Sequence, residues 1–484
     1  MKYQAIENKN NKDILSCKTL QHNSPATRIY STEIKILFTT IILVGIICAF
    51  ISNFAILLAT FLALCIAIIY YGDFRTIVFF TFCIFFQNIF LIIYSPSLSD
   101  LESQLFIIFK ELIVYICTFQ YILKQITHKT EKSKFIDKIC NILLGITFIM
   151  LVINILKPNA PLGARITAAR QIALMPLCYY FGKSLSISTI SLKRFYLLLI
   201  RLTQILCICG LIIYILPESF WRDINLFVYL KNKIGTTTLE LPASFYSYDL
   251  GYKVKRLVSF IAEPVATSHL IGLACISTFI CFKRKIFTKL LFIICALLCI
   301  SKTLLFFSVC SIIIYIYAHI RNKKKRFFFL IISILIAITS TIYLISHFSN
   351  MEQNTATGNH LLSFVYGINN ATLGGNGVGT AGFNVAEMND EFDDGYTESF
   401  FAILVAQIGS IGTGAFYLFL FLKGIYLIKE YREKNKNPYI LNASIILFSV
   451  TFESFISASS ISMLGTSLFF IISGITERNI HNLN

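Results

Sequence analysis

Long uncharged apolar blocks constrain this chain more than any other feature. The stretch from Ile36 to Tyr71 contains no Asp, Glu, Lys or Arg. As a single helix it would measure about 54 Å, which exceeds the roughly 30 Å hydrocarbon core of a bilayer. Ser52 and Asn53, near its middle, therefore predict a tight hairpin between two membrane spans.

Similar blocks recur as far as residue 476, and 56% of all residues are hydrophobic. Solid apolar blocks are typical of membrane-spanning helices, whereas a β-barrel would alternate apolar and polar residues. The sequence thus predicts an all-α polytopic membrane protein with about 14 transmembrane helices. After the hairpin, the predicted spans are 76–94, 104–123, 139–156, 171–188, 195–216, 264–282, 286–301, 303–320, 327–348, 399–427, 438–456 and 459–476.

Basic residues predict the orientation of these spans. The chain has 42 Lys and Arg against 25 Asp and Glu, a formal net charge of +17. Many basic residues lie in short segments between apolar blocks, such as 321–326 and 429–436, which is typical of cytoplasmic loops. This pattern predicts cytoplasmic tails at 1–33 and 477–484 around one transmembrane domain at 34–476. Two long loops, at about 217–263 and 349–398, are then extracytoplasmic.

The same features exclude other classes. No surface that interleaves basic and aromatic side chains is apparent, so we expect no nucleic-acid partner. Nearly all of the 14 Cys lie inside apolar blocks, where small buried hydrophobes are the ordinary explanation. No cysteine spacing indicates zinc, and no metal site is expected. The mostly polar residues 1–33 are long for a cleavable signal peptide and predict that the first helix is an uncleaved anchor.

Several basic residues break the orientation pattern, because they lie on the predicted extracytoplasmic side. They include Arg165, Arg170, Arg222 and Arg256, together with Lys302 in a very short external turn. Any one of them could be an interfacial side chain that extends toward water. Together they favour an anion site, because an arginine fork binds phosphate oxygens bidentately. A diphosphate at the membrane surface fits such a cluster.

Two glutamates lie where long external loops enter helices. Glu263 precedes Pro264 and is an N-cap by position, although Glu is not a favoured cap residue. Capping would explain it, but it could also pair with Arg256 or act as a base. Glu398 lies where an acidic loop meets an apolar block, and a carboxylate desolvated there could act as a general base.

The remaining polar features are less specific. His347 and His360 are minor base candidates, whereas His269, inside a predicted span, is more typical of a hydrogen-bonded core residue. The glycine-rich segment "GGNGVGTAGF" (Gly374–Phe383) lacks the Gly-Lys-Ser/Thr of a P-loop. It is either a flexible loop or a place where backbone approaches a sugar or phosphate closely.

Three passages together resemble a known family. They are "RLVSFIAEPVATSHLIG" from Arg256, "ISKTLLFFSVCSIII" from Ile300, and "GGNGVGTAGF" followed by "YTESFFAILVAQIGSIG". Over about residues 160–425 the chain resembles Wzy-type O-antigen polymerases, within the broader group of O-antigen ligases and polymerases. In the ligases a His commonly begins the helix after the second loop. Glu398 takes that position here, which favours a polymerase.

The resemblance implies a metal-independent glycosyltransferase of the GT-C type that needs no cofactor. Its donor would be a growing glycan on undecaprenyl diphosphate, and its acceptor a lipid-linked repeat unit. Arg165, Arg170, Arg256 and Lys302 would bind the diphosphate, and Glu398 or Glu263 would act at the acceptor. The family usually works with a chain-length regulator. The implied location is the bacterial inner membrane with a periplasmic active site. An O-antigen ligase and a flippase or transporter of lipid-linked sugars remain alternatives.

Overall fold

The computed structural model describes the chain from Gly72 to Ile480 with short gaps. The described ranges are 72–97, 100–127, 135–234, 241–247, 252–282, 284–348, 356–382, 398–433, 436–455, 457–458 and 462–480. All of them belong to one compact unit, Cys65–Asn484. The predicted tail at 1–33 and the predicted hairpin over 36–71 lie outside the described residues.

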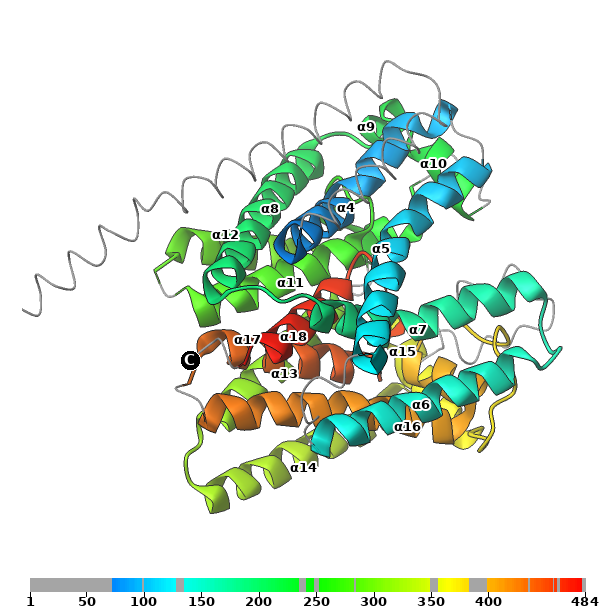
Figure 1. Cartoon of the computed structure of the whole chain (residues 1–484). Helices are drawn as coiled ribbons and strands as arrows, with labels where there is room; N and C mark the ends of the chain where they lie inside the picture. The colour runs from blue at the N-terminus through cyan, green and yellow to red at the C-terminus, as the bar shows by residue number, and fades with distance from the viewer. Residues whose placement is uncertain are drawn as a thin grey trace, which may run out of the picture. The chain divides into compact units, whose positions relative to one another are not determined.

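The described chain is almost entirely helical, which confirms the all-α prediction, and each predicted span after the hairpin overlaps a helix (Figure 1). The last of these begins at Ser467 rather than at 459, because residues 463–466 form turns. The helix predicted at 171–188 begins earlier, at Leu162, so Arg165 and Arg170 lie on it. The helices are α4 (Asp73–Tyr94), α5 (Asp100–Thr127), α6 (Phe135–Ile155), α7 (Leu162–Ser184), α8 (Thr189–Ile215), α11 (Pro264–Cys281), α12 (Ile286–Leu298), α13 (Lys302–His319), α14 (Lys323–Phe348), α16 (Phe400–Glu433), α17 (Pro438–Glu453) and α18 (Ser467–Asn479).

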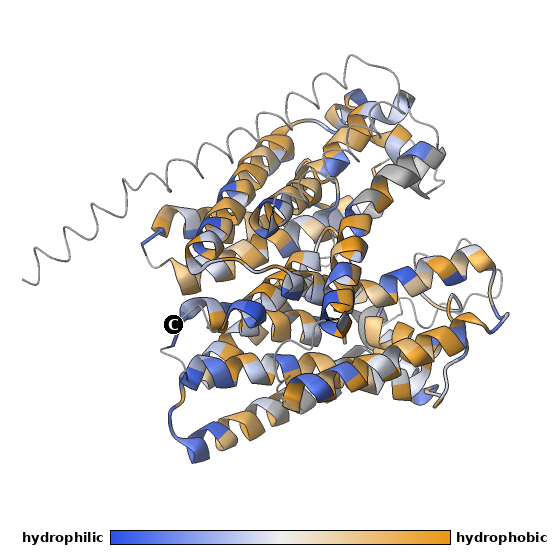
Figure 2. Ribbon diagram, viewed as in Figure 1, coloured by the Kyte–Doolittle hydropathy of each residue, from blue (hydrophilic) through white to orange (hydrophobic). Residues whose placement is uncertain are grey.

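Five of these helices, α4, α6, α8, α11 and α16, are long and apolar enough to cross a membrane. Figure 2 shows hydrophobic residues along most of the helical surface. Apolar side chains of α6 and α12, among them Ile142, Ile149 and Phe287, are exposed. Exposed apolar surface on this scale is expected where a lipid chain rather than water is the neighbour. The structure therefore fits an all-α protein embedded in a membrane.

The two long predicted loops contain short elements that the sequence did not indicate. The first holds α9 (Ser219–Asp223), α10 (Leu226–Ile234) and an antiparallel pair of two-residue strands, β1 (Tyr246–Ser247) and β2 (Val254–Lys255). The second holds α15 (Ala356–Asn369). These pieces bring the loop backbone back onto the helices.

Helices α7 and α18 meet at glycines. A Cβ atom added to Gly182 would collide with the backbone of Ile471, and one added to Gly474 would collide with the carbonyl of Tyr179. Small residues at such crossings let helix backbones approach closely, which is the usual basis of helix association in membranes. This contact fixes the distance between the two helices.

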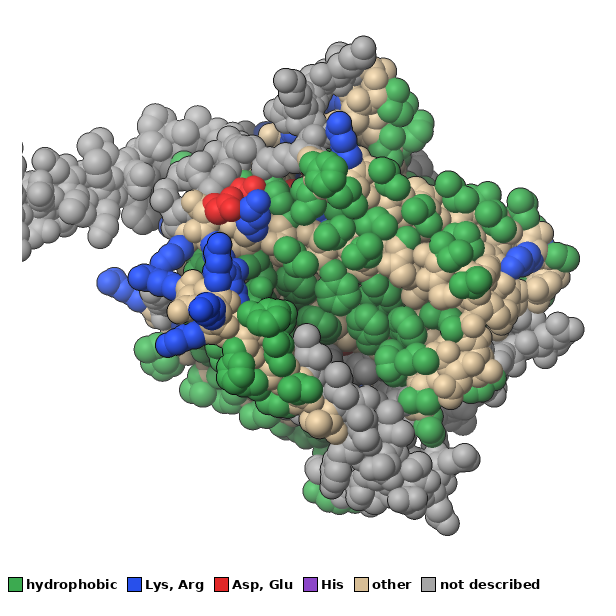
Figure 3. Space-filling view, turned by 90° about the horizontal axis from the view of Figure 1, so that it is seen from below, with side chains coloured by type: hydrophobic (Ala, Val, Ile, Leu, Met, Phe, Trp, Pro, Cys, Tyr) green, Lys and Arg blue, Asp and Glu red, His purple; other side chains and the backbone are tan. Residues whose placement is uncertain are grey.

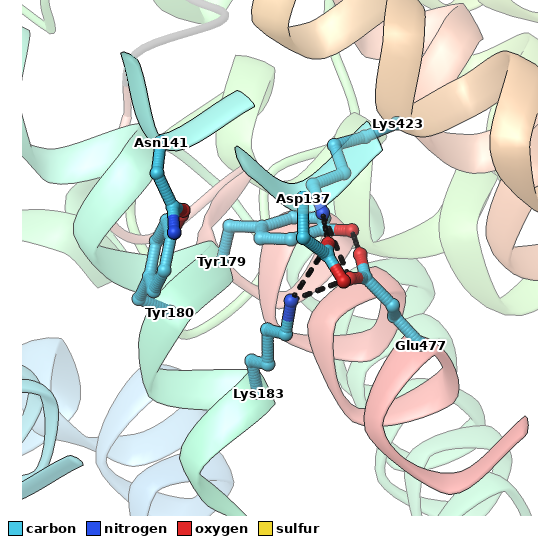
Figure 4. A network of polar contacts seen from close by, with 7 residues as sticks. All are labelled: Asp137, Asn141, Tyr179, Tyr180, Lys183, Lys423 and Glu477. Carbon is cyan, nitrogen blue, oxygen red and sulfur yellow. Dashed lines mark hydrogen bonds and ion pairs between the residues drawn. The ribbon is translucent and has the colours of Figure 1, made fainter. Parts of the chain in front are cut away.

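Four charged residues surround the same crossing and form what we call the four-residue ring: Asp137 and Lys183, which are half-buried, and Lys423 and Glu477, which are buried (Figure 4). Lys183 Nζ lies 3.2 Å from Asp137 Oδ1 and 2.6 Å from Glu477 Oε1. Lys423 Nζ lies 2.5 Å and 2.8 Å from the same two oxygens. Each cation therefore contacts both anions, and the four formal charges cancel.

The ring joins four helices. Asp137 lies at the start of α6, Lys183 at the end of α7, and Lys423 and Glu477 in the later parts of α16 and α18. Tyr179 donates a further hydrogen bond to Glu477 Oε2. Since an unpaired buried charge costs several kcal/mol, mutual pairing is what makes these positions tolerable. We refer to this end of α6, α7 and α16 as the ring end, and to their opposite end as the loop end.

Candidate functional site

At the loop end, α16 is kinked at Gly409, whose φ is 71°. A kink interrupts the regular pattern of backbone hydrogen bonds and frees some of the donors and acceptors. The glycine-rich segment supplies partners for them. Ser410 N donates to Thr372 O at 2.8 Å, and Ala406 O accepts from Asn376 N at 2.6 Å. The loop is thus docked into the kink of the helix.

Glycine is required at two places in this loop. Gly375 and Gly379 have φ values of 75° and 88°, in the left-handed region that favours glycine. A Cβ at Gly375 would lie 2.6 Å from Gln407 O on α16, and one at Gly379 would lie 2.9 Å from Arg165 N on α7. Sequence analysis left open a flexible loop or a close approach to a sugar or phosphate. The close approach seen in the structure is to the protein's own backbone.

Polar side chains hold the loop from both sides. Asn154 Nδ2 donates to Gly374 O at 2.8 Å, and Lys157 Nζ donates to Gly375 O at 2.6 Å. From α16, Gln407 Oε1 accepts from the N–H of Gly379 at 3.3 Å. The segment between α6 and α7, the glycine-rich loop and α16 therefore form one assembly.

Arg165 belongs to this assembly. Its Nη1 donates to Ile155 O at 2.9 Å and to Lys157 O at 3.4 Å. Its Nε is buried and has no hydrogen-bond partner among the described residues. Arg170, just over one turn further along α7, lies with its Nε 3.3 Å from Glu111 Oε2 on α5. The two arginines predicted to bind one diphosphate thus have different partners within the protein.

Arg256 directly follows β2 and contacts the end of another helix, α12. Its Nε donates to Cys299 O at 3.0 Å, Nη2 to Ile300 O at 3.0 Å and Nη1 to Ser244 O at 3.2 Å. Two of these carbonyls follow the last turn of α12, where a cation is stabilised by the helix dipole. The guanidinium is therefore a fixed positive charge at the end of α12.

Lys255, the residue before Arg256, is likewise a cation at the end of a helix. Lys255 Nζ donates to Tyr214 O at 3.0 Å and to Leu216 O at 2.9 Å, at the end of α8. Burial lowers the pKa of Lys255, and the carboxylate of Glu218 acts in the opposite direction. Helix ends thus explain part of the basic charge on the predicted external side, an explanation that sequence analysis did not consider.

The turn before Lys302 lies next to Arg256 and the start of α11. Ser301 caps α13 by accepting from Leu304 N, and it is 3.1 Å from the hydroxyl of Ser268 on α11. The side chain of Lys302 itself lies outside the described residues. Two of the three passages behind the family resemblance therefore contact each other, although more than 40 residues separate Arg256 from Ile300.

Glu263 occupies the N-cap position of α11, as predicted, with Pro264 in the first turn. Its side chain makes no capping hydrogen bond, so capping is not the function of the carboxylate. Its carbonyl accepts from Thr267 N at 3.0 Å and from the Thr267 hydroxyl at 2.9 Å. The carboxylate itself is half-buried.

Sequence analysis missed a pair of side chains that joins α11 to α17. Its first member, His269, lies one to two turns into α11. His269 Nε2 is 2.6 Å from Glu453 Oε1 on α17, and His269 Nδ1 is 2.8 Å from Val265 O. A carbonyl can only accept, so Nδ1 carries a proton. A second proton then lies between Nε2 and Glu453, so the pair is either imidazolium with carboxylate or neutral imidazole with carboxylic acid. We call these two residues the buried His–Glu pair.

Glu453 Oε2 is buried and has no hydrogen-bond partner among the described residues. The only sequence signal for this residue was a lone acid at the end of an apolar block, "LFSVTFES". His269 was expected to be a hydrogen-bonded core residue, and it is one.

The segment after α17 connects this pair to Glu398. Ala458 N donates to Glu398 O at 2.9 Å, and Phe401 N donates to Ser454 O at 3.1 Å. On the other side, the hydroxyl of Ser363 on α15 accepts from Glu398 N at 3.3 Å. The backbone of Glu398 is thus held between α15 and the segment that begins beside Glu453, and its side chain is half-buried.

The predicted site residues therefore form two linked groups. Arg256, the turn at Lys302 and Glu263 surround the start of α11, whereas Arg165 and the glycine-rich loop surround the start of α7. Glu398 and the segment after α17 connect the two. The side chains of His347 and His360 and the acidic stretch 383–397 lie outside the described residues. Within the described ranges, no cluster of three His, Cys, Asp or Glu could hold a metal ion.

Comparison with known proteins adds no family to this geometry. No protein-family model matches the chain, and no curated protein matches it.

Proposed function

We propose that the chain is a polysaccharide polymerase of the O-antigen type. It would transfer a growing glycan from undecaprenyl diphosphate to an incoming lipid-linked repeat unit on the extracytoplasmic face of the bacterial inner membrane. The observation that carries the proposal is the meeting of the passages that resemble the family. Arg256 contacts the turn at Lys302. Glu398 contacts the segment after α17, and Glu453 at the end of α17 contacts His269 on α11.

The proposed reaction exchanges one bond at the anomeric carbon of the donor. The acceptor hydroxyl oxygen bonds to that carbon, the bond from the carbon to the diphosphate oxygen breaks, and undecaprenyl diphosphate leaves. The hydroxyl proton passes to a carboxylate, for which Glu398 is the first candidate and Glu263 the second. Charge that develops on the diphosphate is stabilised by fixed positive groups, the kind of preorganised contribution that is usually the largest in catalysis.

The contacts of the arginines refine their proposed roles. Arg256 is held by three carbonyls, so its charge needs no reorganisation when a diphosphate approaches. Arg165 has a buried Nε without a partner among the described residues, and it lies against the glycine-rich loop. Arg170 is paired with Glu111 and would contribute less.

The proposal predicts different outcomes for the two carboxylates. Glu398→Gln in purified enzyme should lower the rate of chain extension by about 100- to 10,000-fold, because a general base is lost. Its melting temperature should stay unchanged, because Gln preserves the shape of the side chain. Glu263→Gln should lose only part of the activity. The assay follows lipid-linked repeat units as they become longer chains in detergent. Near-normal turnover by Glu398→Gln eliminates it as the base.

Deletion of the gene in its host, followed by gel display of the surface glycan, separates the three candidate functions. A lost polymerase leaves surface molecules capped by a single repeat. A lost ligase leaves finished glycan on its carrier lipid, and a lost flippase leaves repeat units facing the cytoplasm. Either of the last two patterns overturns the proposal.

A further inference from the structure

A dense basic patch covers the start of α14. Arg321, Lys323, Lys324 and Lys325 are exposed, and Arg326 is half-buried. We call these five residues the basic patch. Figure 3 shows Lys and Arg side chains gathered on one part of the face seen there, with apolar side chains over the adjoining surface. Figure 2 shows the same contrast between the hydrophilic start of α14 and the hydrophobic turns that follow.

The stability of α14 does not explain this placement. Asn322 caps the helix, since its Oδ1 accepts from Lys324 N at 2.9 Å and from Lys325 N at 3.4 Å. The first turn of a helix carries a partial positive charge, so acidic residues are favoured there and lysines are unfavourable. Three lysines and an arginine in that turn therefore weaken the helix. Orientation in the membrane needs basic residues near the span but not within the first turn.

The basic patch continues directly into an exposed apolar surface. Residues four apart lie above one another on a helix, so each row along α14 can be followed from its first residue. The row that starts at Lys323 continues with Phe327, Ile331 and Leu335, whose exposed fractions are 66%, 38% and 54%. The side chains at its charged start and along its apolar length therefore lie on one exposed face.

The neighbouring row repeats the pattern. It starts at Lys324 and continues with Phe328, Ile332 and Ile336, which are 65%, 37% and 59% exposed. Two adjacent rows, each with a cation at one end and apolar side chains along about two turns, match the shape and chemistry of an anionic amphiphile. An acidic protein or a polynucleotide would match the cations but not the apolar rows.

The end of α13, which directly precedes the basic patch, is anchored to α16. Arg432 near the end of α16 donates to Tyr317 O at 2.7 Å, and Tyr431 contacts His319 at the end of α13. Because the turn at Arg321 follows directly, the basic patch is presented on a fixed support rather than on a free tail. A preformed surface binds with less ordering cost than a mobile one.

We propose that the basic patch and the two apolar rows of α14 form a binding surface for an anionic phospholipid. The phosphate would contact Lys323 and Lys324, and an acyl chain would lie along the rows that begin with them. Each basic side chain near an anionic lipid surface changes affinity by about five-fold.

The test uses the full chain in detergent, titrated with phosphatidylglycerol or phosphatidylcholine and read by native mass spectrometry. Wild type should bind phosphatidylglycerol the more tightly. The double variant K323Q/K324Q should weaken that binding by about 25-fold at low salt. The matched control K193Q/R194Q removes two adjacent basic residues near the start of α8 and should bind like wild type.

Three results would overturn the proposal. Wild type could bind both lipids equally, the two double variants could lose affinity equally, or glycerol phosphate could compete as well as phosphatidylglycerol, which would indicate a site for a soluble anion. If K323Q/K324Q does not fold, the proposal is tested by the salt dependence of lipid binding to wild type. Its preference for phosphatidylglycerol must then shrink as salt is raised, because exposed charges are screened.

Discussion

The ring end and the loop end of α6, α7 and α16 bury polar groups in different ways. At the ring end, two cations and two anions contact one another, and their formal charges cancel. At the loop end, Asn154, Lys157 and Gln407 hold the glycine-rich loop through its backbone, and no acidic side chain is among these contacts. The charged Arg165 keeps a buried Nε without a partner among the described residues. The buried His–Glu pair, with its unpartnered Glu453 Oε2, is linked to the loop end through Glu398.

This difference indicates that the ring end is structural and that the candidate site is at the loop end. A closed, neutral network needs nothing further and serves to hold helices together. Buried charged atoms with incomplete pairing are costly, and in native proteins they call for a functional explanation. Of the predicted site residues, Arg165 and Glu398 lie at the loop end, at the starts of α7 and α16. Three substitutions test this assignment, in order of decreasing effect on stability.

The largest loss of stability is expected from Glu477→Gln at the ring end. It leaves Lys183 and Lys423 with Asp137 alone, so one buried positive charge is uncompensated. Removing one partner of a buried ion pair costs about 3–5 kcal/mol. The free energy of unfolding, measured in detergent, should fall by that amount. Adding Lys423→Met restores neutrality and should recover a large part of the loss. If the double variant is less stable than Glu477→Gln, charge balance is not what the ring provides.

A smaller loss is expected from Gly379→Ala at the loop end. The new Cβ would meet Arg165 N in a backbone conformation that costs about 1–3 kcal/mol for a residue other than glycine. Gly374→Ala in the same loop is the matched control. No atom lies within 4 Å of its added Cβ, and its stability should change by less than about 0.5 kcal/mol. Equal melting temperatures for the two variants would mean that the loop is not docked as described.

The smallest loss is expected from Glu453→Gln in the buried His–Glu pair. The new amide can donate to the unprotonated Nε2 of His269, so the contact survives while one proton is released. The free energy of unfolding should fall by less than about 1.5 kcal/mol, well below the loss caused by the same substitution at Glu477. A loss as large as that of Glu477→Gln would show that the pair is as structural as the ring, and the contrast between the two regions would fail.

The helices could be predicted because they depend on local pattern. An apolar block long enough to span a membrane has few alternatives to a helix, since every backbone group must be satisfied within the segment. Pro264 after Glu263 likewise located the start of α11. Both signals depend only on residues that are close together in the sequence, so they can be recognised from one sequence alone.

The contacts of the site could not be predicted because they depend on pairing across the chain. Nothing near Arg256 in the sequence indicates that its donors reach Cys299 and Ile300. Glu453 and His269 lie 184 residues apart, and each alone is an ordinary polar residue in an apolar block. Glycine is common in loops, so its presence at Gly379 did not reveal that Arg165 N is the atom it accommodates.

The four-residue ring can be completed only near the end of synthesis, because its members are spread from residue 137 to residue 477. The ribosome makes Asp137 and Lys183 first, one charge of each sign, so these two can pair as soon as α6 and α7 meet. Lys423 comes later, in the last part of α16. Its second counter-charge, Glu477, is made last of the four. Until α18 has been translated, α16 therefore carries an incompletely neutralised cation, and the final packing of four helices awaits the last of them.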